Sequence, residues 1–177
     1  MDCQYCKLSK LNYEEIESAD GIEFAEALSE AKYLERPFAY EFYHQFRCLL
    51  ENKTVNFGGA LIQGEVDKRY QHIPGVGDIP DFIIHLPDSS ENNHAVVEFK
   101  LASQGIEAIS EDLDKLVGFQ GPELHYDHIV EVIIGSKEEL ERRREPVISK
   151  AQELGQSIII VEFDVMSWKA RTRIVPS

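Results

Sequence analysis

Apolar residues recur along the chain with two different periods, every second position in short runs and every three or four positions in longer ones. The alternating runs predict strands near 55–65, 80–84, 95–100, 128–135 and 158–163. The longer runs predict helices near 34–50, 106–120 and 137–154. Because helices follow strands in turn, we expect an α/β protein with a central mixed sheet flanked by helices.

The runs at 80–84 and 95–100 are joined by a polar stretch that is typical of a hairpin loop. Alternation places Glu98 and Lys100 on one face of the second strand, which we expect to point outward to solvent. A hairpin symmetric about 89–90 would bring Asp81 beside Glu98, with Cβ atoms about 4.5 to 5.5 Å apart. Two carboxylates at that distance can bind the same divalent cation.

The motif Pro80-Asp81 followed by Glu98-Phe99-Lys100 resembles that of the PD-(D/E)xK nuclease superfamily, which includes many restriction enzymes and Holliday-junction resolvases. The order of the predicted elements beyond about residue 34 is also similar to the αβββαβ core of that family. The resemblance therefore implies a restriction-endonuclease-like fold over most of the chain.

The same resemblance implies roles for individual residues. Asp81, Glu98 and the backbone carbonyl of Phe99 would bind Mg²⁺ or Mn²⁺. Lys100 would orient or help to deprotonate the attacking water, and Glu41 would supply the further acid that the family places on an upstream helix. By analogy, hydrolysis would leave a 5′-phosphate and a 3′-hydroxyl.

Several other residues are weaker candidates, each with an ordinary structural explanation. Glu65 is an alternative to Glu41 as the further acid, and His85 shares the predicted face of Asp81, where a polar neighbour is the commoner role. Substrate contacts are assigned to Lys115, Gln120, Lys68 and Arg69. For Lys115 and Gln120 the alternative is a solvated helix face and a helix end, and we expect the helix at 106–120 to expose Asp112, Asp114 and Lys115.

The chain has 177 residues, of which 43% are hydrophobic, enough for a single domain. We divide it into an acidic segment at 1–33, a nuclease-like core at 34–166 and a basic tail at 167–177. No apolar run is long enough for a membrane span, and the start of the chain lacks the features of a secretory signal. Three cysteines suit a reducing compartment, so we expect a cytoplasmic protein, with Cys3 and Cys6 as free thiols.

The charge balance argues against unaided DNA binding, because 32 acidic and 18 basic residues give a net charge of −14. Basic residues nevertheless gather at Lys68 and Arg69, at 142–144, and at 169–173. They would form a local positive track only if folding brings some of them to one side. A solvated helix and a basic tail explain each cluster equally well when it is taken alone.

These features favour a magnesium-dependent endonuclease acting on DNA, possible as a homodimer because many relatives dimerise. The alternative is a noncatalytic module, or one that depends on a basic protein partner, within a DNA-processing complex. A nucleotide-binding α/β protein is not supported, because the chain has neither a Walker A loop nor a Gly-x-Gly-x-x-Gly motif after a strand.

Overall fold

The structure is a computed structural model. It describes residues 35–52, 58–64, 79–86, 93–122 and 124–177. The chain divides into two compact units, Met1–Tyr33 and Leu34–Ser177, and every described residue belongs to the second. Among the described helices, none is both long and apolar enough to cross a membrane.

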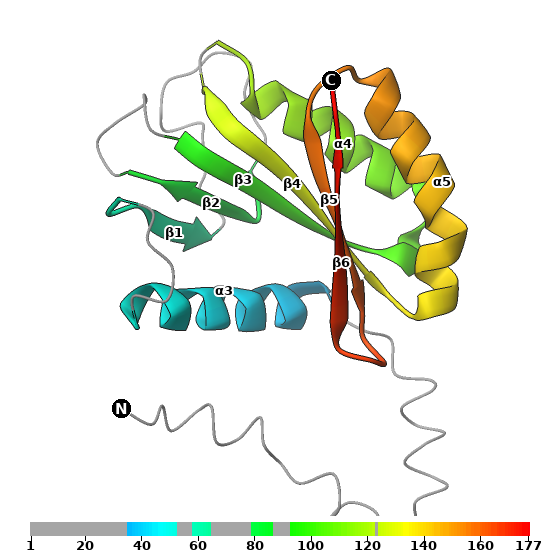
Figure 1. Ribbon diagram of the computed structural model, residues 1–177, viewed down its shortest axis with the longest axis horizontal. Coiled ribbons are helices and arrows are strands. Elements are labelled where there is room, and N and C mark those ends of the chain that lie inside the picture. Colours follow the sequence, from blue (N-terminus) through cyan, green and yellow to red (C-terminus); the bar gives the residue numbers. More distant parts are fainter. Residues whose placement is uncertain (1–34, 53–57, 65–78, 87–92, 123) are drawn as a thin grey trace, which may run out of the picture. The chain divides into compact units, whose positions relative to one another are not determined.

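A six-stranded mixed sheet forms the centre of this unit, with its strands in sequence order from β1 to β6 (Figure 1). Strands β3, β4 and β5 are parallel, whereas the β1–β2, β2–β3 and β5–β6 pairs are antiparallel. The strands are β1 (Leu61–Gly64), β2 (Phe82–His85), β3 (Asn93–Leu101), β4 (Tyr126–Gly135), β5 (Ile158–Asp164) and β6 (Lys169–Val175). The helices are α3 (Glu35–Glu51), the short 3₁₀ helix η3 (Ala102–Gln104), α4 (Ile106–Phe119) and α5 (Lys137–Glu153). The predicted mixed sheet flanked by helices is thus confirmed.

Helices cover both faces of the sheet, α3 on one side and α4 with α5 on the other (Figure 1). The face under α3 contributes the buried side chains of Phe82, Ile84, Val97, Phe99, Val132 and Ile134. The face under α4 and α5 contributes Ile83, Val96, Ile129, Ile133, Ile158 and Ile160. Consecutive residues of each strand therefore enter two different cores, as strand alternation requires.

Local signals place the two crossover helices. Gly105 adopts φ +99°, a conformation that favours glycine, and lets the chain turn from η3 directly into α4. Ser136 begins α5 with a capping box, in which its side chain accepts a hydrogen bond from the Glu139 N–H and the Glu139 carboxylate accepts one from the Ser136 N–H. These helices make the connections that the parallel strands β3, β4 and β5 need.

The β2–β3 hairpin has the predicted register. Phe82 pairs with Val97 and Ile83 pairs with Val96, the pairing expected for symmetry about 89–90. The register shifts between Ile84 and His85, where a bulge interrupts the ladder. The Asp81 end of the hairpin keeps the predicted alignment, and this is the end that matters for the site.

Three predictions were wrong in part. The charged face of β3 does not point to solvent, because α4 covers it and leaves Glu98 only 3% exposed. Residues 169–175 are not a tail but strand β6, held against the sheet by pairing with β5 and by the buried side chain of Val175. The strand expected at 55–65 is shorter, Leu61–Gly64, with 55–57 and 65 lying outside the described residues.

Candidate active site

The backbone hydrogen bonds between β2 and β3 end next to Asp81, and the side chain of Asp81 continues the contact with β3. The residue before it is Pro80, which has no N–H to donate to a neighbouring strand. The Asp81 carboxylate instead accepts a hydrogen bond from the backbone N–H of Phe99, with an Oδ2–N distance of 2.8 Å. This bond holds Asp81 against β3, next to Glu98.

The Phe99 backbone carbonyl points to the same side as Asp81. In an extended strand the N–H and C=O of one residue point toward the same neighbouring strand. Because the Phe99 N–H points to Asp81, its carbonyl oxygen also faces that edge, while its ring enters the core under α3. The predicted carbonyl ligand and the predicted carboxylates therefore belong to one neighbourhood.

Helix α4 supplies partners for both charged side chains of β3. Lys115 Nζ lies 2.6 Å from Glu98 Oε1 and donates a hydrogen bond to the Ile79 carbonyl at 2.8 Å. Lys100 Nζ lies 2.9 Å from Asp112 Oδ2. The prediction that Asp112 and Lys115 are exposed was wrong, because the two flank the apolar stripe of α4 and turn toward the charges of β3.

Two further acids reach this neighbourhood that sequence reasoning missed. Glu35, the first residue of α3, accepts a hydrogen bond from Gln104 Nε2 at 3.1 Å and interacts electrostatically with Lys100 and Asp81. Glu131 of β4 pairs in register with Glu98 and is fully buried. Neither carboxylate oxygen of Glu131 has a hydrogen-bond partner in the described part of the chain.

Several acids are buried close together here, and this raises their pKa values. Burial raises the pKa of Glu98 to about 8, and the charge of Asp81 adds to the effect although Lys115 opposes it. Burial also raises the pKa of Glu131 well above its ordinary value, with contributions from Asp112 and Glu98. For Glu35 burial again raises the pKa, while Lys100 acts in the opposite direction. The site therefore attracts positive charge, either a proton or a cation.

Lys100 stays protonated in this setting. Burial alone would lower its pKa, but the hydrogen bond and charge of Asp112 raise it above the ordinary value, and Glu35 and Glu131 act in the same direction. A lysine with a raised pKa can donate hydrogen bonds and neutralise negative charge. It does not readily accept a proton from water.

Other predicted residues lie elsewhere. Glu41 is exposed on α3 and accepts a hydrogen bond from Gln45 at 2.6 Å, so the acid that α3 brings to the site is Glu35. Gln120 is the C-terminal cap of α4, about 7.5 Å along the axis from Lys115. His85 contacts Gln63 at 2.6 Å, at the end of β2 away from Asp81. Glu65, Lys68 and Arg69 lie outside the described residues.

The donor chemistry fits a hard divalent cation, although the side chains are not gathered around one point. No group of three or more His, Cys, Asp or Glu side chains in the described ranges has an arrangement that could hold a metal ion. Instead, two carboxylates form ion pairs with lysines, Glu98 with Lys115 and Asp112 with Lys100. Carboxylate and carbonyl oxygens from Asp81, Glu98 and Phe99 are nevertheless the ligand types that Mg²⁺ and Mn²⁺ prefer.

A pocket of about 200 Å³ opens beside the site, between α3 and the Asp81 end of β2. Glu35, Arg36 and Asp81 form its polar part, and Tyr40 and Tyr43 are among its aromatic and apolar lining residues. The pocket leaves Asp81 reachable from one side.

No family model matches the chain, and no curated protein or solved structure matches it either.

Proposed function

We propose that the protein is a metal-dependent nuclease that hydrolyses DNA phosphodiester bonds and has a restriction-endonuclease-like core. The observation that carries the proposal is the contact of Asp81 with the Phe99 backbone, which places Asp81, Glu98 and the Phe99 carbonyl together with Lys100 nearby. Support also comes from the order of elements, in which a helix, three strands, a helix and a strand follow one another from α3 to β4.

Each residue has a role that follows from its surroundings. Asp81, Glu98 and the Phe99 carbonyl would hold Mg²⁺ or Mn²⁺, and Glu35 takes the role first assigned to Glu41. The bound ion would polarise the phosphodiester and lower the pKa of a coordinated water. Protonated Lys100 would donate a hydrogen bond to a phosphate oxygen and stabilise the negative charge that develops there.

Lys115 contacts the Glu98 carboxylate that a divalent cation would also bind. It neutralises Glu98 through a contact of 2.6 Å when no other cation is present. A divalent cation at Glu98 would displace the ammonium group, because both compete for the same carboxylate. The displaced lysine would then be free to contact a phosphate, which is the substrate role that its position after the motif implies.

A plasmid-nicking assay tests the proposal, with supercoiled DNA in Mg²⁺, Mn²⁺ or EDTA. We expect the wild type to nick only with metal, and Asp81→Asn and Lys100→Met each to lose about 100-fold or more in rate. Asp114→Asn makes the same chemical change on the exposed side of α4 and should cleave like wild type. Undiminished cleavage by Asp81→Asn and Lys100→Met would sink the assignment of the site.

The second candidate is a noncatalytic or partner-dependent module in a DNA-processing complex. It is favoured by the lysine pairs, which neutralise Glu98 and Asp112 without a metal ion. Calorimetric titration with Mn²⁺ separates the two, because a nuclease should bind the ion at a site that Asp81→Asn removes. No Mn²⁺ binding, and no cleavage of plasmid, single-stranded or branched DNA, would favour the module.

A further inference from the structure

Three cations form a row on the outermost strand, far along the sheet from Asp81. Lys169, Arg171 and Arg173 alternate along β6 and so project from one face, the face that carries α5. We call these three residues the β6 ridge. Successive members are two residues apart, about 6.7 Å along an extended strand, which is similar to the distance between neighbouring phosphates of a nucleic-acid strand.

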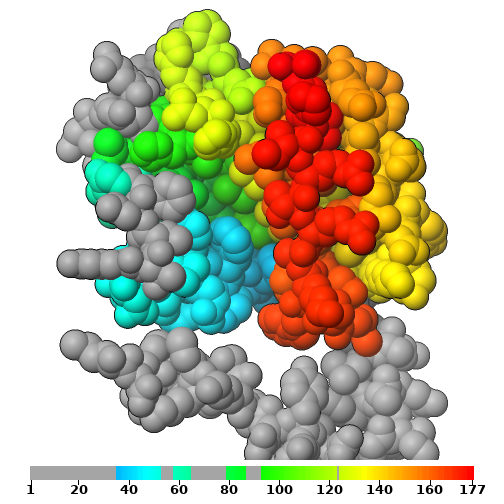
Figure 2. All heavy atoms as spheres, viewed as in Figure 1, coloured from blue at the N-terminus to red at the C-terminus, as the bar shows by residue number. Residues whose placement is uncertain are grey.

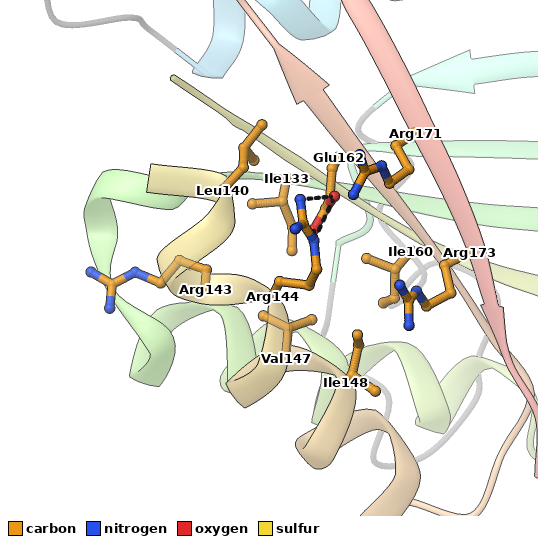
Figure 3. Close-up of a pocket in the computed structure, with 10 residues that line it drawn as sticks. All are labelled: Ile133, Leu140, Arg143, Arg144, Val147, Ile148, Ile160, Glu162, Arg171 and Arg173. Atoms are coloured by element: carbon orange, nitrogen blue, oxygen red, sulfur yellow. Dashed lines mark hydrogen bonds and ion pairs between the residues drawn. The ribbon is translucent and has the colours of Figure 1, made fainter. Parts of the chain in front are cut away.

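Folding brings this ridge against a second basic cluster from α5. Arg144 donates hydrogen bonds to both carboxylate oxygens of Glu162, with distances of 2.8 to 3.2 Å, and Glu162 pairs in register with Arg171. Figure 3 shows Arg144 bound to Glu162 with Arg171 and Arg173 projecting from β6 beside them, while Arg143 points away. Of the basic residues at 142–144, Arg144 is thus the one that meets the ridge.

The groove between α5 and β6 continues toward the end of the sheet at which β3 carries Lys100. A pocket of about 280 Å³ at that end is lined by Lys137 of α5 and by Lys169 and Arg171 of the ridge, together with the acids Glu141, Glu162 and Asp164. Lys100, Ile133, Glu162 and Arg171 are aligned in register across β3 to β6. Three steps between strands separate Lys100 from Arg171, about 14 Å.

The ridge is exposed and its charges are available. All three side chains are exposed, and within the described ranges none of them forms an ion pair. Figure 2 shows the red atoms of β6 at the surface beside the orange and yellow atoms of α5. In a protein of net charge −14, a row of exposed cations beside a partly buried Arg–Glu pair is a local exception to the charge balance.

We propose that the β6 ridge binds the phosphates of a DNA strand and holds that strand in register with the candidate active site. The identity of the strand as a substrate rests on the proposed nuclease function, whereas its binding does not. The ridge supplies the positive contacts that DNA binding requires and that the overall composition lacks. Arg144 fixes Glu162, and the two together form the floor beside which the strand lies.

Fluorescence anisotropy with labelled DNA in EDTA measures binding apart from cleavage. The variant Arg171→Gln, Arg173→Gln removes two cations from exposed positions and keeps the length of the side chains. We expect it to weaken DNA binding at least about tenfold at low salt and to lower the salt dependence by about two contacts. The matched control, Arg47→Gln with Arg142→Gln, removes the same charge from exposed positions outside the groove and should bind within about twofold of wild type.

Equal losses in the ridge variant and the matched control would overturn the inference, because net charge alone would then explain binding. Binding by the ridge variant that equals wild type would also overturn it. Aggregation of that variant would then show that these charges protect the edge strand. Displacement of DNA by polyglutamate as readily as by unlabelled DNA would point to an acidic protein partner instead. A ridge variant that loses binding, with a wild type that never cleaves, would support the ridge and reject the nuclease.

Discussion

The two faces of the sheet are both buried but are built from different chemistry. Under α3 the core is aromatic and aliphatic, with Phe99 in contact with the rings of Phe38, Phe42 and Phe82. Under α4 and α5, aliphatic side chains alternate with the carboxylates of Glu98 and Glu131. The same strands supply both faces, so the difference lies in which positions carry aromatic rings and which carry acids.

The two faces contribute differently to stability, since one buries apolar side chains and the other buries acids as well. Burial of apolar side chains under α3 stabilises the sheet without electrostatic cost. Burial of acids under α4 and α5 costs free energy unless each is paired or protonated, and Glu131 has no partner among the described residues. A feature that costs stability in an otherwise ordinary sheet is expected to serve binding or catalysis.

Removing the centre of the aromatic face should have the largest effect on stability. We expect Phe99→Ala to lower the free energy of unfolding by about 3 to 5 kcal/mol, because the residue is 1% exposed and its ring is packed against three others. Urea denaturation followed by circular dichroism measures the loss. A cost below about 1 kcal/mol would show that the face under α3 does not carry the stability assigned to it.

Replacing the unpartnered acid should have the opposite sign. We expect Glu131→Met to raise the free energy of unfolding by about 1 to 3 kcal/mol at pH 8. The raised pKa of Glu131 means that the unfolded chain loses its proton first as pH rises, so the native acid costs more at pH 8 than at pH 5. The gain should therefore shrink at pH 5.

Denaturation at both pH values, with Glu111→Met on the exposed side of α4 as control, checks this prediction. The control should stay within about 0.5 kcal/mol of wild type. A loss of stability at pH 8 in Glu131→Met would mean that Glu131 has a stabilising role in its charged form.

A divalent cation should sharpen the contrast by stabilising only the acidic face. At a free Mn²⁺ concentration 100 times the dissociation constant, we expect about 2.7 kcal/mol of added stability in wild type and none in Asp81→Asn. Because the pKa of Glu98 is raised to about 8, the effect should grow from pH 6 to pH 9 as this ligand loses its proton. Thermal unfolding with Mn²⁺ or EDTA measures it, and equal protection of Asp81→Asn would place the ion elsewhere.

An ion pair at the surface should matter least. Lys150 Nζ lies 2.7 Å from Asp114 Oδ1, but the Asp114 side chain is 54% exposed. We expect Lys150→Met to change the free energy of unfolding by less than about 1 kcal/mol, since water screens exposed pairs. A larger loss, measured by the same denaturation, would indicate that helix–helix contacts between α4 and α5 depend on this pair.

Reasoning from sequence succeeded where short-range pattern sets the outcome. The β2–β3 register followed from alternation and from the length of the intervening loop, because a slip by one residue would turn every side chain to the other face. These two features therefore predict that Asp81 lies beside Glu98. The family resemblance led to Glu41 on α3 instead of Glu35, because an amphipathic pattern does not reveal which turn of a helix lies over a given strand.

The sequence alone specified strands β2 to β5, helices α3 to α5 and the hairpin that aligns Asp81 with Glu98, because these depend on neighbouring residues and their period. Packing of distant segments was needed to bury the charges of β3 beneath α4, to bring Glu35 and Glu131 to them, and to turn a supposed tail into β6. The physical reason is that periodicity assigns a residue to a face, whereas only the assembled layers settle what covers that face and which charges meet there.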